Sequence, residues 1–180
     1  MLKTPSSTVI GGAGIWTPSA WKIGLDVLNL GQLIRNLFSQ SEIGFAYDPN
    51  DLTTLYQDAA GTIPVTGAEQ PVGLVKDKSG RNNHAYQTTP SLCPLLQNSP
   101  RKIDYDGVDD KLTVSLPAQL TGCTVVRAVP NVGTQILTNQ TIPTAFDDNI
   151  DNCGLLVINR ALTATETAQI TQIFNRLAGV

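Results

Sequence analysis

Three segments decide how this chain is predicted to fold: Asp77-Lys-Ser-Gly-Arg-Asn-Asn-His-Ala85, Ile103-Asp-Tyr-Asp-Gly-Val-Asp-Asp-Lys-Leu112 and Gly154-Leu-Leu-Val-Ile-Asn-Arg-Ala-Leu-Thr-Ala-Thr-Glu166. The first segment contains glycine and asparagine, which tolerate left-handed backbone conformations, and it therefore predicts a tight loop. The second leads into residues 111–116, where Leu112, Val114 and Leu116 alternate with polar residues and predict a half-buried strand. The third joins a continuous apolar run, typical of a strand covered on both faces, to the start of a helix.

The C-terminal segment predicts an amphipathic helix that begins after Thr163. Thr163 and Glu166 have the spacing of a capping box, in which each side chain accepts a hydrogen bond from the backbone of the other residue. An apolar stripe then follows at helical spacing, formed by Ile170, Ile173, Phe174 and Leu177. Short strands with frequent turns, closed by one terminal helix that caps a sheet, favour an all-β fold of the sandwich type over residues 45–180.

Residues 1–44 differ in composition from the rest and are predicted to form an extended N-terminal arm. The arm contains a glycine-rich run over 11–14 and both tryptophans of the chain, Trp16 and Trp21. Because glycine-rich sequence cannot build its own core, these tryptophans need another surface to cover them, and another chain is one candidate. The end of the arm carries apolar residues at the spacing of a short amphipathic helix, which packs either on its own domain or on a neighbour.

The composition excludes several classes of protein. Charged residues make up only 15% of the 180 residues and the net charge is −3, so nucleic acid, which binds clustered Lys and Arg, is not expected as a partner. The apolar runs are far shorter than the roughly 20 residues of a membrane span. The N-terminus lacks the apolar region of a secretory signal, which predicts synthesis in a cytoplasm. The widely spaced Cys93, Cys123 and Cys153 predict small buried side chains rather than disulfides or a zinc site.

The quoted segments resemble the landmarks of the concanavalin-like, laminin-G-like β-sandwich, especially the version found in bacteriophage virion proteins. Asp77 to Ala85 is similar to the loop Asp-x-Ser-Gly-x-Gly-Asn-His-Ala of that family, with Asn82 where the pattern has Gly. Tyr105 to Leu112 is similar to its Phe-Asp-Gly-Val-Asp-Asp-Tyr-Leu strand and turn, and 155–166 to its final strand and Arg-Ala-Leu-Thr-x-x-Glu turn. A fourth block, Gly44 to Thr66 followed by 70–75, is similar to a module of phage tail-fibre-like and other virion proteins.

One departure from the family lies between Leu112 and Leu155. This chain is shorter there than a full family member by about 50 to 70 residues, which corresponds to roughly four or five strands with their turns. The resemblance therefore implies an abridged jelly-roll sandwich. Because an incomplete sandwich exposes sheet edges, we expect another subunit to complete it and the protein to form a homo-oligomer.

The resemblance implies a structural component of a bacteriophage virion, made in the host cytoplasm and bound to other capsid or tail proteins. Its position stays open between a head decoration or minor capsid protein and a tail-fibre-like protein. The arm is expected to dock it on the particle through large apolar side chains, which dominate interface energetics: Trp16, Trp21, Leu33, Ile34, Leu37 and Phe38.

A carbohydrate-binding, lectin-like module for glycans of the host surface is the alternative function. In that reading Asn82, Asn83 and His84 form a ligand loop at the rim of the sandwich, whereas otherwise they only shape a backbone turn. An enzyme is not predicted, because the sequence singles out neither a nucleophile with its base nor a pair of catalytic carboxylates.

Metal ions and cofactors are not expected, with calcium at one acidic cluster as the exception that is considered. Asp106, Asp109 and Asp110 offer oxygen ligands of the kind that Ca²⁺ prefers, although the same residues are common in turns. A second acidic group over 147–151 lacks EF-hand spacing and is predicted to be a solvated loop.

Overall fold

The computed structural model describes residues 29–180 of the chain. It contains two α-helices, α1 (Leu30–Leu37) and α2 (Ala164–Ala178), and two short 3₁₀ turns over Leu52–Thr54 and Pro90–Leu92. The strands are β1 (Gly44–Tyr47), β2 (Leu55–Tyr56), β3 (Leu74–Val75), β4 (Ala85–Tyr86), β5 (Leu95–Gln97), β6 (Lys102–Asp104), β7 (Leu112–Ser115), β8 (Leu120–Val129), β9 (Gly133–Ile142), β10 (Ala145–Asp148) and β11 (Leu155–Ile158). Antiparallel sheets therefore dominate the described part of the chain, as predicted.

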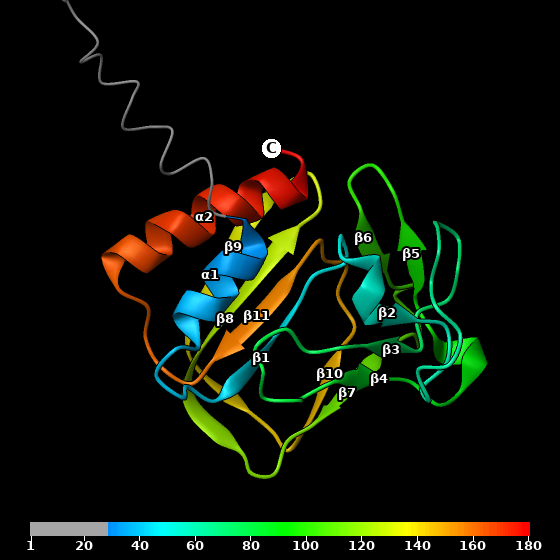
Figure 1. Ribbon diagram of the computed structural model, residues 1–180, viewed down its shortest axis with the longest axis horizontal. Helices are drawn as coiled ribbons and strands as arrows, with labels where there is room; N and C mark the ends of the chain where they lie inside the picture. Colours follow the sequence, from blue (N-terminus) through cyan, green and yellow to red (C-terminus); the bar gives the residue numbers. More distant parts are fainter. Residues whose placement is uncertain (1–28) are drawn as a thin grey trace, which may run out of the picture.

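The strands form two main sheets that pack as layers. Sheet A has four strands in the order β1-β11-β8-β9, and sheet B has five in the order β10-β7-β4-β3-β2. Both helices lie on the face of sheet A that is turned away from sheet B, so that the layers follow one another from left to right in Figure 1. A small sheet C pairs β5 with β6 beside this sandwich. The arrangement is sandwich-like, with one helical layer on the outside.

Strands β1 and β11 of sheet A are buried on both faces, which explains their continuous apolar runs. Every residue of β1 and of β11 is buried. Phe45 and Val157 pair across these strands and face the core between the sheets, whereas Ala46 and Leu156 pair and face the helices. The prediction that the run after Gly154 is a strand covered on both faces is therefore confirmed.

Sheet B closes the inter-sheet core with one face and leaves the other open. In β7, Leu112 and Val114 are buried, while Thr113 and Ser115 are not, which confirms the alternation predicted from the sequence. The same inward face includes Leu55, Val75 and Ala85. Each large aliphatic side chain that is fully buried in this way contributes about 1.5–3 kcal/mol to folding.

Helix α1 packs on its own domain, which corrects the predicted arm. Leu33, Ile34 and Leu37 are each 1% exposed and Phe38 is 5% exposed, because they fill the core between sheet A and α2. These four side chains are core residues and not free docking anchors. Helix α1, which was predicted as part of an arm over 1–44, therefore belongs to the folded domain. The other two predicted anchors, Trp16 and Trp21, lie outside the described residues.

A buried ion pair links the two sheets. Arg127 of sheet A donates to Asp148 of sheet B at 3.0 Å, and Asp148 also accepts hydrogen bonds from Tyr105 and Asn152 at 2.9 Å each. Burial raises the pKa of the Asp148 carboxyl, an effect that the charge of Arg127 opposes. The acidic segment 147–151 is therefore not simply a solvated loop as predicted, because Asp148 points into the core.

The start of α2 confirms the predicted capping box. The Thr163 hydroxyl accepts from the Glu166 backbone N–H at 3.2 Å, and the Glu166 carboxylate accepts from the Thr163 backbone N–H at 2.8 Å. Arg160 adds two hydrogen bonds to the same carboxylate at 2.7 and 2.9 Å. This bidentate pair lowers the pKa of Glu166 from 4.5 to about 2. The Arg, Thr and Glu of the Arg-Ala-Leu-Thr-x-x-Glu segment therefore hold the start of α2 through hydrogen bonds to one another.

The structure also bears on two predictions made from composition. Cys93, Cys123 and Cys153 are free and buried, as expected. Within residues 29–180, none of the helices has the length and apolar character needed to cross a membrane.

We predict that Glu166→Gln lowers the free energy of unfolding by about 1 kcal/mol at neutral pH, because it weakens both the helix cap and the pair with Arg160. The folded-state pKa of Glu166 is depressed, so its contribution is complete above about pH 4.5 and is lost as the pH falls towards about 2. Urea denaturation of both proteins across this range measures the difference. A difference that stays constant down to the lowest pH would contradict this account.

Candidate functional site

The loop from Asp77 to Ala85 is organised around one carboxylate. The oxygens of Asp77 accept hydrogen bonds from the backbone N–H groups of Ala46 at 2.9 Å, Ser79 at 2.8 Å and Asn83 at 3.0 Å, and from the Ser79 hydroxyl at 2.7 Å. A carboxylate that accepts several N–H bonds fixes the backbone around it, because each charge-assisted bond is strong and directional. The bond to Ala46 also ties the loop to β1 in sheet A.

Neighbouring residues of the loop bind β1 and also the segment that precedes it. The Asn83 side-chain amide donates to the Gly44 backbone carbonyl at 2.8 Å, and the Asn83 backbone carbonyl accepts from the Tyr47 hydroxyl. Arg81 donates to the backbone carbonyls of Glu42 and Phe38 at 2.7 and 2.9 Å. Asn83 is therefore engaged with its own domain and not aimed at a ligand.

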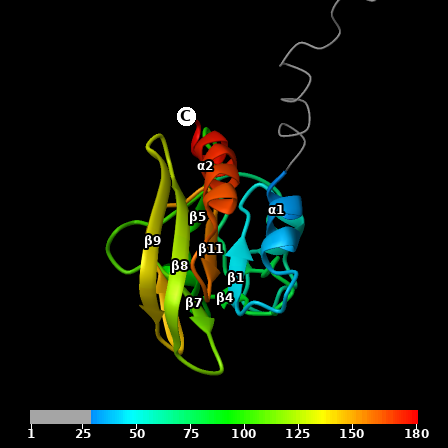
Figure 2. The same cartoon turned by 90° about the vertical axis from the view of Figure 1, so that its left-hand side faces the viewer.

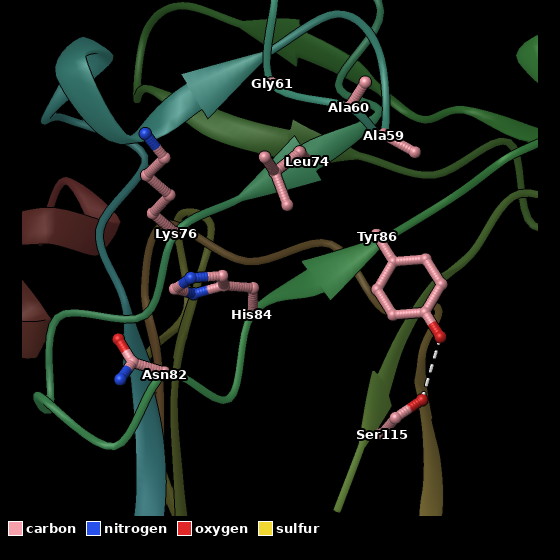
Figure 3. A pocket seen from close by; sticks show the side chains of 9 residues that line it. All are labelled: Ala59, Ala60, Gly61, Leu74, Lys76, Asn82, His84, Tyr86 and Ser115. Atoms are coloured by element: carbon pink, nitrogen blue, oxygen red, sulfur yellow. Dashed lines mark hydrogen bonds between the residues drawn. The ribbon is translucent and has the colours of Figure 1, made fainter.

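Asn82 and His84, the other two residues of the predicted ligand loop, line a hollow on the open face of sheet B. Asn82 has a φ of 59°, a left-handed conformation that asparagine tolerates and that the family pattern fills with Gly. The hollow has a volume of about 450 Å³, within the range of small-molecule sites. Its lining is drawn in Figure 3: Ala59, Ala60, Gly61, Leu74, Lys76, Asn82, His84, Tyr86 and Ser115.

The strand register places the floor of this hollow. Leu74 of β3 lies opposite Tyr86 of β4, and the neighbouring Val75 and Ala85 point into the core. In Figure 3, Lys76, His84 and Asn82 gather on one side of Leu74, and Tyr86 with Ser115 lies on the other. The Tyr86 and Ser115 hydroxyls are joined by a hydrogen bond of 2.9 Å. The hollow thus has a charged and polar side, an apolar floor and an aromatic side.

The position of Lys76 is set by an aromatic ring. Its ammonium donates to the Tyr56 hydroxyl at 2.9 Å and lies 4.4 Å from the centroid of the same ring, a cation–π contact. Among the described residues, Lys78, Lys102 and Lys111 form salt bridges with aspartates, whereas Lys76 forms none. Lys76 therefore brings a positive charge to the hollow that no carboxylate of the described residues neutralises.

The state of His84 follows from its hydrogen bond. Its Nδ1 accepts from the Asp77 backbone N–H at 3.0 Å. A ring nitrogen that accepts carries no proton, so the neutral imidazole holds its proton on Nε2. His84 is consequently a hydrogen-bond donor through Nε2, and the Asp77 loop determines which nitrogen donates.

Sequence reasoning found the loop but missed the rest of the lining. Lys76 directly follows β3, Tyr86 lies in β4 and Ser115 lies in β7. Which strands are neighbours in the sheet cannot be read from local patterns. The alternation of Thr113 and Ser115 with buried residues did indicate which side chains face outward. The strands around Lys76 and Tyr86 have only two residues each, too few for a periodic pattern.

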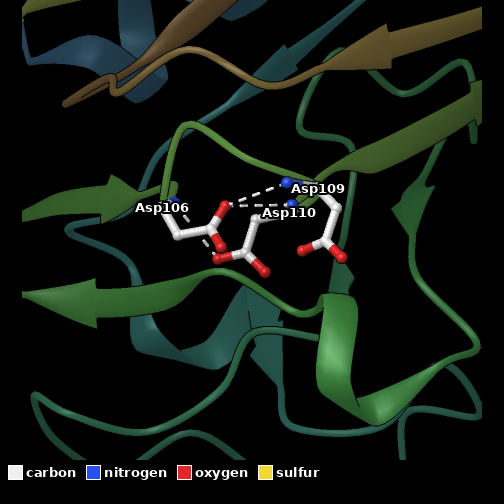
Figure 4. A group of neighbouring side chains, drawn as sticks. All are labelled: Asp106, Asp109 and Asp110. Atoms are coloured by element: carbon white, nitrogen blue, oxygen red, sulfur yellow. Dashed lines mark hydrogen bonds between the residues drawn. The ribbon is translucent and has the colours of Figure 1, made fainter.

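The predicted calcium residues are also brought together. Carboxylate oxygens of Asp106, Asp109 and Asp110 lie within 4.8 Å of one another (Figure 4). Asp106 accepts from the backbone N–H groups of Val108 at 2.9 Å and of Asp109 and Asp110 at 3.2 Å each. These bonds hold the three aspartates in a turn, and the turn alone accounts for their closeness. The bonds from Val108 and Asp110 are the main reason why the pKa of the Asp106 carboxyl is lowered. Calcium binding here stays a prediction.

No protein-family model, no curated protein and no solved structure matches this chain.

We predict that Asp77→Ala lowers the free energy of unfolding by about 3 kcal/mol, because it leaves several partly buried N–H groups without their charged acceptor. Asp109→Ala is the matched control. The Asp109 side chain is exposed, and its loss is expected to change stability by less than about 0.5 kcal/mol. Urea denaturation compares the two variants, and equal effects would show that the Asp77 carboxylate does not hold the loop.

Proposed function

We propose that this protein is a structural component of a bacteriophage virion, with an abridged concanavalin-like jelly roll as its domain. It acts as a head decoration, a minor capsid protein or a tail-fibre-like protein, and it has other capsid or tail proteins as partners. The virion is its location in this proposal, and it carries out no catalysis.

One observation supports this proposal above all: the segments that resemble the virion domain pack against one another. Strand β1, from the block that begins at Gly44, pairs along its whole length with β11 of the last block. The Asp77 loop binds β1 through Ala46 and Gly44. The block before β7 also reaches the segment that precedes β11, because the Tyr105 N–H donates to Asp151 at 2.9 Å. Blocks far apart in sequence thus form one connected unit, as expected if the resemblance reflects a common fold.

The position of α1, at the start of the described domain, agrees with docking of the protein through residues 1–28. The described chain begins at Asn29, which caps α1, and α1 lies on the helical side of sheet A. The open face of sheet B is the opposite layer of the domain (Figure 1). A domain held through residues 1–28 would therefore present sheet B away from its attachment.

We predict that deletion of residues 1–28 prevents incorporation into particles and leaves the domain folded. Both core clusters lie within residues 29–180, so the circular dichroism spectrum and the cooperative unfolding transition of the domain should be retained. Mass spectrometry of purified particles measures incorporation of the full chain and of the deletion. Undiminished incorporation of the shortened chain would overturn docking through this segment.

Strand β9 supports the proposal that the protein is a homo-oligomer. It is the last strand of sheet A on one side and has ten residues, none of them charged. Leu137 on this strand is 41% exposed, and Figure 2 shows β9 at the margin of the molecule. Long edge strands without charges or proline are favourable surfaces for the addition of another strand. A second copy of the chain is the partner proposed for this edge.

We predict that the protein self-associates at micromolar concentration and that Leu137→Lys shifts it to the monomer. A charge on the edge opposes strand addition by desolvation and by repulsion between copies. Val132→Lys is the matched control, since Val132 is 77% exposed but lies in the turn before β9. Sedimentation velocity measures the species present. A monomeric wild-type protein, or equal effects of both variants, would contradict association through β9.

A carbohydrate-binding module for host-surface glycans is the second candidate function. The observation that favours it is the hollow on sheet B, which combines hydrogen-bonding side chains with the ring of Tyr86. Sites for small polar ligands have such a mixture of apolar walls and a few convergent polar groups. This function is compatible with a place in the virion, because an outward sheet face could contact the host surface.

A further inference from the structure

The hollow on sheet B has an unusual balance of charge for this protein. The chain has a net charge of −3, yet the residues that line the hollow include Lys76 and, among the described residues, no aspartate or glutamate. The neighbouring hollow, of about 490 Å³, has no charged residue in its described lining of Leu52, Thr53, Tyr56, Pro64, Val65 and Thr66. Of these two hollows, only the first is lined by a positively charged residue.

The polar groups of this hollow are mainly donors. Lys76 has three N–H bonds and uses one on Tyr56. His84 offers an N–H from Nε2, because its Nδ1 is occupied by Asp77. Asn82 is exposed at the rim and carries an amide with two N–H bonds. A ligand rich in acceptors and negative in charge complements this set best.

The opposite side of the hollow suits a ring. Tyr86 and Leu74 provide carbon surface, and the Tyr86 and Ser115 hydroxyls form a polar edge beside it. Figure 3 shows this side across Leu74 from Lys76 and His84. A sugar ring has apolar faces and hydroxyls around its edge, so one face can lie on carbon surface while its substituents meet polar groups.

We propose that this hollow binds an acidic saccharide, in which a carboxylate or sulfate group contacts Lys76 and His84 and the sugar ring lies towards Tyr86. The inference rests on the glycan-binding function proposed above and narrows its ligand class. Asn83, which sequence reasoning placed in the ligand loop, takes no part, because its side-chain amide N–H and its backbone carbonyl are both bonded to β1. Lys76 supplies the selectivity for charge, and His84 supplies a directed donor.

The test uses the full chain on a panel of immobilised glycans. Sialylated and uronic-acid-bearing glycans, and sulfated glycans as a separate group, are each paired with the neutral glycan of the same backbone. We expect binding to the acidic members and at least tenfold weaker binding to their neutral counterparts. The carboxylate and sulfate groups of the panel identify which anion is preferred.

Three variants assign the selectivity to the hollow. Lys76→Gln should weaken acidic-glycan binding at least tenfold, whereas Lys76→Arg, which keeps the charge, should stay within a few-fold of the wild type. Arg35→Gln removes one positive charge from the exposed face of α1 and should change nothing. Circular dichroism confirms that each variant is folded.

The outcomes separate the narrower inference from the function on which it rests. Equal binding of acidic and neutral glycans, or binding that Lys76→Gln does not change, would refute the acidic ligand class while glycan binding stands. Equal losses in Lys76→Gln and Arg35→Gln would show a general effect of charge and also refute the site. If the folded full chain binds no glycan at all, both the site and the glycan-binding function fail.

Discussion

The carboxylate of Asp77 is the constraint on which the arrangement of the domain depends. It accepts hydrogen bonds from N–H groups of its own loop and of Ala46 in β1. Strand β1 is one of the two edge strands of sheet A, the sheet that lies between the helices and sheet B. The same residue donates its backbone N–H to His84. One side chain therefore joins sheet A to the loop that borders the hollow on sheet B, so that fold and candidate site share a single local structure.

The elements predicted correctly from the sequence are those with a clear hydrophobic pattern or capping signal within one segment. β7, β11 and α2 were found because alternation, a continuous apolar run and a capping box are each signals within one segment. The helix α1 was found too, but its partner was not, because an apolar stripe is the same whether it meets its own sheet or another chain. Leu33 and Ile34 are accordingly core residues, although the sequence suggested exposed anchors.

The parts of the site that sequence reasoning missed depend on contacts between distant residues. Lys76 and Ser115 approach one hollow only because β3, β4 and β7 are neighbours in sheet B. Asp148 looked like a residue of a solvated loop, and its burial follows from Arg127 in the other sheet. Neither of these contacts between distant residues can be predicted from the local sequence. By contrast, Asn82 and His84 were found because they belong to one short loop.

The most direct test concerns His84, which is the only histidine of the chain and therefore gives an unambiguous NMR signal. Long-range ¹H–¹⁵N correlation spectra of its imidazole at mildly alkaline pH distinguish the two neutral tautomers. If Asp77 holds the loop as described, the ring has its proton on Nε2, and Nδ1 shows the shift of an unprotonated, hydrogen-bonded nitrogen. A proton on Nδ1, or the averaged shifts of a freely exchanging ring, would contradict the account.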